Sequence, residues 1–183
     1  MFPDVRGRKI LIVAHCIFNQ NAVMNSVASY PGTMEKVANL IMDAKIGILQ
    51  MPCLEMNTLG LDRGKIEGYK DGITVENTRI RGALEENIPD KIMNDFVNYI
   101  ILQIKEYMRY GFTIVGIVGI NRSPTCGVNT TSANGVEVEG EGIFIQKIKR
   151  ELKNLNIEIP FVGVKGSEPE KSVADLKALL GMK

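Results

Sequence analysis

The sequence predicts an α/β fold in which helices cover a mostly parallel sheet. Four short apolar runs, rich in β-branched residues, are typical of strands buried on both faces. They lie at residues 9–14, 46–51, 113–120 and 159–164. Segments with helical periodicity separate them, and this alternation favours parallel pairing through right-handed crossovers. We therefore expect a Rossmann-like three-layer sandwich with a sheet of about four strands, formed by a single domain over residues 1–183.

Four segments have the residue pattern of the covering helices. Thr33 is placed to cap the first of them. Apolar residues recur at helical spacing from Pro89 to Gly111, which is the strongest helical pattern in the chain. Residues 143–155 form a third amphipathic segment. A capping box with a proline in the first turn, at residues 167–170, predicts the start of the last helix.

Two connecting segments are expected to contribute neither a helix nor a strand of the main sheet. Residues 55–87 are rich in Gly, Asp and Lys, and the Asp71-Gly72 pair predicts a short hairpin there. Residues 127–142 are rich in Gly, Asn and Ser. We expect this second segment to be a loop that lies over neighbouring structure as a flap.

Composition and charge narrow the class of protein. The net charge is +1 and the pI is near 7.7, so nucleic acid is an unlikely partner. No apolar run approaches the ~20 residues of a membrane-spanning helix, and the first residues lack the pattern of a signal peptide. We expect a cytoplasmic protein without a membrane partner, and the sequence leaves its oligomeric state open.

The three cysteines are the residues best suited to chemistry. Cys16, Cys53 and Cys126 each follow one of the first three predicted strands. They should meet at the carboxyl edge of the sheet, where α/β proteins bind ligands. No two of them form a C-x-x-C pair, and disulfides are rare in the cytoplasm. Thiolates at such an edge favour zinc or iron–sulfur chemistry, whereas the alternative is three buried cysteines that act as small apolar side chains.

His15 offers a fourth ligand for zinc. In an extended segment, however, His15 and Cys16 would point to opposite faces, so both would not reach one ion easily. An iron–sulfur cluster held by three cysteines needs no such ligand and leaves one iron open as a Lewis acid. We therefore expect a cluster on the three cysteines.

The loop at residues 121–127 places further polar groups beside Cys126. Its Ser-Pro-Thr turn carries two hydroxyls, and Arg122 precedes it. A guanidinium in this position could stabilise thiolate charge or bind a phosphate. The alternative is an ordinary turn that ends a strand and carries a solvated arginine.

Together these motifs resemble the thiouracil desulfidase (TudS) family. The loop Ser123-Pro-Thr-Cys-Gly127 matches the S-P-x-C-G signature of that family, and Cys16 closes an N-terminal strand as the first family cysteine does. The remaining matches are Pro52-Cys53-Leu-Glu55, the following Gly60-Leu61 and Arg63, and Gly140-Glu-Gly142. The resemblance covers roughly residues 9–164.

The resemblance implies a 4Fe–4S cluster on Cys16, Cys53 and Cys126, with the unique iron free for the sulfur of a substrate. It implies a non-redox reaction that removes sulfur from a thiolated pyrimidine, giving the oxo-pyrimidine and hydrogen sulfide. The expected partner is a small thiolated nucleobase or nucleotide, such as thiouracil or thiouridine monophosphate. Ser123 resembles the family serine that contacts the substrate.

The chain departs from the family in two places, which indicates a divergent subgroup. After Cys16 it has Ile-Phe-Asn-Gln-Asn in place of an Arg-Tyr-Asp-Gly-like stretch. Asn19, from this stretch, and Arg122 are candidate substrate-binding residues. The family carries a catalytic glutamate just ahead of its second cysteine, but here the stretch Ile48-Leu-Gln50-Met-Pro before Cys53 contains no acid. Glu55 is therefore the nearest candidate for the acid and base of catalysis. Glu55 would otherwise be a solvated or helix-starting acid.

Three other functions stay open at this point. The chain could be a non-catalytic cluster protein that stores or delivers sulfide. It could remove sulfur from thiouridine within tRNA, although its near-neutral charge weighs against binding a polyanion. It could also be a nucleotide-binding α/β domain that holds buried thiols and no cluster.

Overall fold

The central sheet confirms the predicted α/β fold. The computed structural model describes residues 4–66, 70–87 and 90–182. Within them four parallel strands pair in the order β2–β1–β3–β6, and helices cover both faces as in a Rossmann-like sandwich. The strands are β1 (Lys9–Val13), β2 (Gly47–Gln50), β3 (Thr113–Ile120) and β6 (Phe161–Val164).

The centre of the sheet is also the centre of the hydrophobic core. In β1, Leu11, Ile12 and Val13 have no exposed surface, and in β3 the same holds for Ile117 and Val118. A strand between two parallel neighbours and two helical layers has no solvent face. A run of branched apolar residues therefore suits it better than an alternating pattern.

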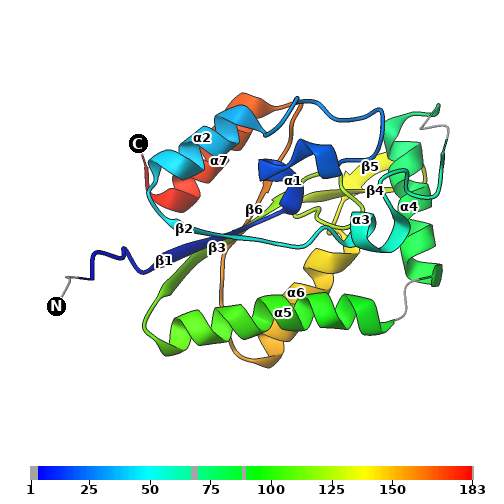
Figure 1. Cartoon of the computed structure of the whole chain (residues 1–183). Helices are drawn as coiled ribbons and strands as arrows, with labels where there is room; N and C mark the ends of the chain where they lie inside the picture. Colours follow the sequence, from blue (N-terminus) through cyan, green and yellow to red (C-terminus); the bar gives the residue numbers. More distant parts are fainter. Residues whose placement is uncertain (1–3, 67–69, 88–89, 183) are drawn as a thin grey trace.

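Helices pack on both faces of the sheet (Figure 1). On one side lie α2 (Glu35–Asp43) and α7 (Pro169–Leu180), and on the other lie α5 (Asp90–Arg109) and α6 (Ile143–Asn154). The amphipathic pattern explains their packing. In α5 the side chains of Val97, Ile100 and Ile104 share one face and are all at most 1% exposed.

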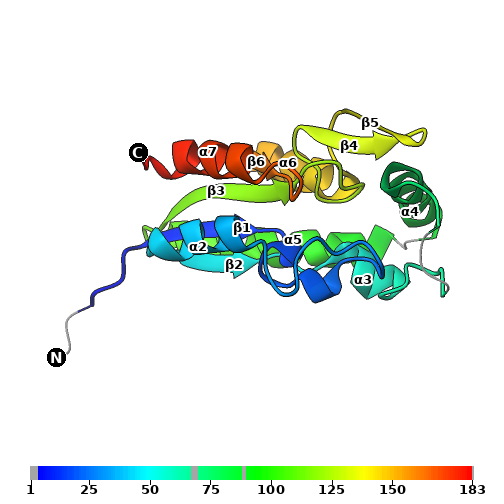
Figure 2. The same ribbon diagram turned by 90° about the horizontal axis from the view of Figure 1, so that it is seen from above.

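The remaining elements gather at the carboxyl end of the sheet, at the right of Figure 1. They include the short helices α1 (His15–Phe18), η1 (Gln20–Ala22) and α3 (Leu54–Leu59), and the longer α4 (Ile73–Asn87). The antiparallel hairpin of β4 (Thr130–Ala133) and β5 (Val136–Glu139) completes the group. Figure 2 shows α4 and this hairpin beyond the end of the main strands.

The expected hairpin at Asp71-Gly72 is wrong. The carbonyl of Gly72 instead accepts hydrogen bonds from the N–H groups of Val75 and Glu76, at 2.9 and 3.2 Å, and so begins the first turn of α4. The expected loop at 127–142 is also wrong over much of its length. Asn134 and Gly135 both have positive φ, 52° and 75°, and form the tight turn of the β4–β5 hairpin.

The helix starts differ in detail from the predicted caps. Neither Thr33 nor Ser167 is the capping residue, because α2 follows Met34 and α7 follows Glu168, both without a side-chain cap. The proline in the first turn of α7 is as predicted. Pro89 lies outside the described residues, and Gly111, with φ of 75°, follows the end of α5.

A membrane-crossing helix is not found in the described part of the chain, where no helix is both long and apolar enough for that role.

Candidate functional site

The three cysteines line one cavity of about 160 Å³ at the carboxyl edge of the sheet. Cys16 lies in α1 directly after β1, Cys53 caps the start of α3 after β2, and Cys126 lies in the loop after β3. The parallel order of β2, β1 and β3 is what brings these distant positions together. Each cysteine is half-buried, and none forms a disulfide.

Close packing fixes the loop that carries Cys126. The hydroxyl of Ser123 accepts hydrogen bonds from the N–H groups of Thr125 and Cys126, at 3.2 and 3.0 Å, so it caps the turn. The start of α6 presses on the same turn. A Cβ added to Gly142 would lie 2.3 Å from the carbonyl of Thr125, so only glycine fits there without movement.

The other two cysteines are held by local hydrogen bonds. The thiol of Cys53 accepts from the N–H of Met56 at 3.4 Å, as an N-cap side chain does. The amide of Gln20 donates to the carbonyl of Cys16 at 2.7 Å. The amide of Gln50, at the end of β2, donates to the carbonyl of His15 at 2.6 Å and ties α1 to the neighbouring strand.

The thiols share one electrostatic environment. Burial raises the pKa of Cys16 to about 12, and the nearby Cys53 and Glu55 add to this effect. Burial is also the main cause that raises the pKa of Cys53 and, more strongly, that of Cys126, which also feels Cys16 and Cys53. At neutral pH the free chain therefore carries three neutral thiols, and a metal group would have to displace their protons.

Glu55 stands beside the cysteines and is largely buried, with 14% of its side chain exposed. One carboxylate oxygen accepts a hydrogen bond from the hydroxyl of Thr125 at 2.6 Å. The other accepts from Nε of Arg63 at 3.2 Å. The hydroxyl of Thr125 lies 3.1 Å from that of Ser123, so Ser123, Thr125 and Glu55 form a continuous chain of polar groups.

Thr125 and Arg63 are functional candidates that sequence reasoning missed. Arg63 is named above only as one residue of a motif, and no role is predicted for Thr125. Thr125 lies 70 residues from Glu55, so no local spacing links them. For Arg63 the available signal is its position between two glycines that turn the chain, Gly60 and Gly64, both with positive φ.

The other predicted residues occupy different places. Arg122 lines the cavity from a left-handed backbone with φ of 72°. Within the described residues its guanidinium forms no ion pair or hydrogen bond, and Glu137 is a nearby charge. Asn19 does not line the cavity. Its side chain caps η1 by accepting from the N–H of Asn21 at 3.1 Å, and it lies 3.4 Å from the ring of His15.

The expected extended conformation at His15 is wrong, because His15 begins α1 and lines the cavity together with Cys16. Even so, among the described residues no group of three or more His, Cys, Asp or Glu side chains is arranged to hold a single metal ion. A single zinc ion needs ligand atoms at about 2.0–2.3 Å.

A loop between η1 and α2 forms one wall of the cavity. Val23, Met24, Val27 and Met34 give this wall an apolar surface. The hydroxyl of Tyr30 donates a hydrogen bond to the carbonyl of Gly166, just after β6, at 2.9 Å. Tyr30 and Gly166 both line the cavity, so this contact ties the loop to the segment after β6.

The fold and the cavity define an α/β protein with three thiols, a carboxylate and an arginine at the ligand-binding edge of a parallel sheet. The chain is 28% identical over 155 residues to an uncharacterized protein of Methanocaldococcus jannaschii, and the match covers 85% of each protein. No family model matches the sequence. No solved structure gives a significant match. The relative's name states no activity, so the resemblance to the desulfidase family remains a prediction.

Proposed function

We propose that this protein is an iron–sulfur-cluster-dependent desulfidase. It would convert a thiolated pyrimidine and water into the oxo-pyrimidine and hydrogen sulfide, with no net oxidation or reduction. The observation that carries the proposal is the meeting of three cysteine thiols, the Glu55 carboxylate and the Ser123 hydroxyl in one cavity. The apolar wall of that cavity suits a planar ring.

The residues present fit a 4Fe–4S cluster. Cys16, Cys53 and Cys126 would hold three of its irons, and the sequence has no fourth cysteine. When bound, the cluster would supply an open iron as a Lewis acid for the thione sulfur.

The protein's own groups account for the proton transfers that the reaction needs. Water that adds to the carbon bearing sulfur must lose a proton, and the hydroxyl of Ser123 lies at the open end of the polar chain. Thr125 donates to Glu55 and can accept from Ser123, so a proton can pass from Ser123 Oγ through Thr125 Oγ1 to Glu55 Oε1. Arg122 supplies a positive charge for an anionic part of the substrate, such as a phosphate.

One observation favours the alternative, a non-catalytic carrier that stores or delivers sulfide. Both oxygens of Glu55 already accept hydrogen bonds, from Thr125 and Arg63, so this carboxylate is less available as a base than a free one. A carrier would need the cysteines and an open iron but no proton transfer.

Turnover measurements on protein purified without oxygen separate these functions. The substrates would be 2-thiouracil, 4-thiouracil, 4-thiouridine monophosphate and thiolated tRNA, each followed by loss of thione absorbance and release of sulfide. If the protein is the proposed desulfidase, we expect multiple turnovers of a small substrate, and Cys126→Ser should abolish this activity. Iron-loaded protein that binds sulfide without turnover would favour the carrier, and turnover of tRNA alone would favour the tRNA enzyme.

A further inference from the structure

Arg63 is a buried cation at the edge of the cysteine site. Only 1% of its side chain is exposed, and it lines the same cavity as the cysteines. Charged residues are seldom this buried unless paired, because removing a charge from water is costly. An ion pair in this position is weak grounds for stability, since apolar residues of similar volume often replace such pairs without loss. Its presence beside the thiols therefore calls for a functional reason.

The guanidinium joins the carboxylate to a cysteine. Its Nε donates to Glu55 at 3.2 Å, and its Nη2 lies 3.9 Å from the thiol sulfur of Cys53. Two backbone carbonyls fix its plane, because Nη1 donates to Gly60 at 2.6 Å and Nη2 to Ala22 at 2.7 Å. Arg63 thus spans from the loop after α3 to the segment after α1, and it reaches both groups in one rigid arrangement.

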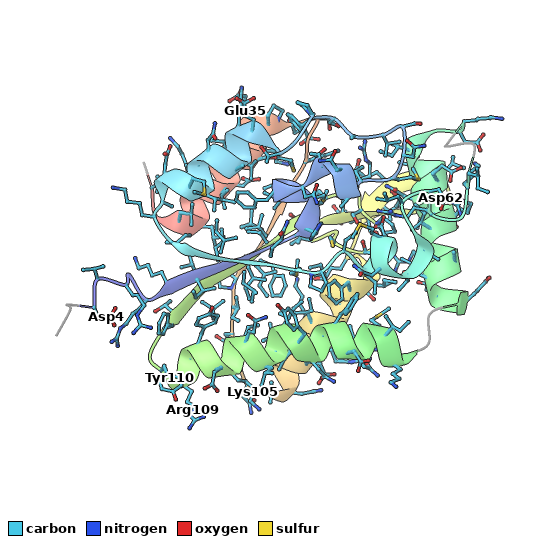
Figure 3. The ribbon with its side chains drawn as sticks, viewed as in Figure 1. Asp4, Glu35, Asp62, Lys105, Arg109 and Tyr110 are labelled. Carbon is cyan, nitrogen blue, oxygen red and sulfur yellow. The ribbon has the colours of Figure 1, made fainter. Side chains whose placement is uncertain are left out.

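The backbone of Arg63 is held in a conformation that side chains seldom adopt. Its φ is 53°, in the left-handed region, which costs about 1–3 kcal/mol unless neighbours enforce it. Its own side-chain contacts with Gly60, Ala22 and Glu55 hold this conformation, and one further contact comes from α4, where Nη2 of Arg79 donates to the carbonyl of Arg63 at 3.1 Å. Arg79 is in turn paired with the buried Glu76. Asp62, which precedes Arg63, marks this loop in Figure 3, at the end of the molecule that holds α3 and α4.

We propose that Arg63 is the positioning residue of the site: it orients the Glu55 carboxylate and supplies the buried positive charge that stabilises an anionic, thiolate-bound cluster at Cys53. The inference rests on the proposed function, because it concerns the cluster that the three cysteines would hold. Three thiolates and one carboxylate concentrate negative charge in the cavity. Arg63 is the guanidinium that touches both Cys53 and Glu55, so it offsets that charge where it develops.

The charge gives a signature that a purely structural role would not. Net charge near a cluster helps to set its reduction potential. Arg63→Gln removes a positive charge and should lower the midpoint potential, whereas Glu55→Gln removes a negative charge and should raise it. The double variant with both substitutions should lie near the wild-type value, and it leaves no unpaired buried charge that could prevent folding.

The experiment compares iron content after anaerobic reconstitution, the midpoint potential and thermal unfolding for these variants and for Arg63→Lys. We expect Arg63→Gln to bind iron about tenfold more weakly or worse, and Arg63→Lys to recover most of the loss. The matched control is Arg79→Gln, which loosens the same loop but keeps the buried guanidinium and should retain iron.

Three results would overturn the inference. They are wild-type iron content and potential in Arg63→Gln, potential shifts of the same sign in Arg63→Gln and Glu55→Gln, and loss of iron in Arg79→Gln equal to that in Arg63→Gln. Wild-type protein that binds no iron contradicts the proposed function and this inference together. If the wild-type protein binds iron and Arg63→Gln has the same iron content and midpoint potential, this inference is contradicted and the proposed function is not.

Discussion

At the scale of single residues, the proposed proton transfer depends most on Glu55. Its carboxylate is held by Arg63 on one side and by Thr125 on the other. We expect Glu55→Gln to keep the cluster and to lower turnover by about 10²–10⁴-fold, the usual contribution of a positioned acid or base. The matched control is Glu139→Gln, at an exposed acid at the end of β5. Turnover unchanged in Glu55→Gln and in the control would remove Glu55 from the mechanism.

A substitution at Thr125 tests the chain of polar groups while Ser123 and Glu55, at its two ends, remain in place. In Thr125→Val the shape is kept, but Ser123 and Glu55 lose the hydroxyl between them. We expect turnover to fall as in Glu55→Gln, and stability to fall by about 1–3 kcal/mol because a buried carboxylate oxygen loses its donor. Thr125→Ser restores the hydroxyl and should restore turnover. A fully active Thr125→Val would show that the proton takes another route.

At the scale of elements, the start of α6 and the Cys126 loop form one packed unit. The contact depends on the absence of a side chain at Gly142. We expect Gly142→Ala to displace the loop and to lower iron content severalfold while all three cysteines remain. Gly82→Ala in α4 is the control, since its new methyl group meets nothing within 4 Å and alanine favours a helix by up to about 1 kcal/mol. Equal iron in both variants would mean that the loop tolerates the shift.

The helix α4 is anchored by a buried carboxylate, and this makes its stability depend on pH. Burial alone would raise the pKa of Glu76, but hydrogen bonds from Lys65 and Arg79 outweigh it and hold the pKa below its ordinary 4.5. The unfolded chain therefore takes up a proton at a higher pH than the folded chain. The stabilisation is fully present above about pH 4.5 and is lost as the pH falls through the lowered pKa.

We expect unfolding in denaturant to show this loss as the pH falls below 4.5. Glu76→Gln should be less stable than wild type by about 1.5–3 kcal/mol at pH 7, and its stability should fall less steeply with acid. The matched control is Glu85→Gln in the same helix, whose pair with Arg81 is exposed on the carboxylate side. Identical acid dependence in Glu76→Gln and wild type would contradict the assigned pKa shift.

The same elements explain which parts of the fold could be predicted from the sequence. The four main strands could be predicted from their branched apolar runs. The central strands β1 and β3 are buried as such runs indicate, whereas in the edge strand β2 Ile48 is 37% exposed, so the expectation of a fully buried strand is wrong there. Helix α4 has no such clear sequence pattern. Among its described residues, Ile80 and Leu84 are the only fully buried apolar side chains, and Gly82 lies between them. Its contacts with β4, β5 and α3 stabilise it instead. The Asn134-Gly135 pair is typical of a hairpin turn. The Gly, Asn and Ser content of residues 127–142 led instead to the expectation of a loop.

At the scale of the whole molecule, topology accounts for the predictable part of the site. Once the strands are taken as parallel, the positions of Cys16, Cys53 and Cys126 at their carboxyl ends follow, and all three line one cavity. The contacts of Arg63 with Cys53 and Ala22 could not be predicted, because they arise from a loop whose path depends on α4. Asn19 shows that closeness in sequence to Cys16 is not enough to place a residue in the site. Its side chain caps η1 instead.

The most direct test of the central claim is the iron and acid-labile sulfide content, with a visible spectrum, of protein purified without oxygen. We expect about four irons per chain and a broad brown absorbance. We also expect Cys16→Ser, Cys53→Ser and Cys126→Ser each to lose most of the iron. Stoichiometric zinc, or no metal after anaerobic reconstitution, would contradict the desulfidase and leave an α/β domain whose three thiols serve another purpose.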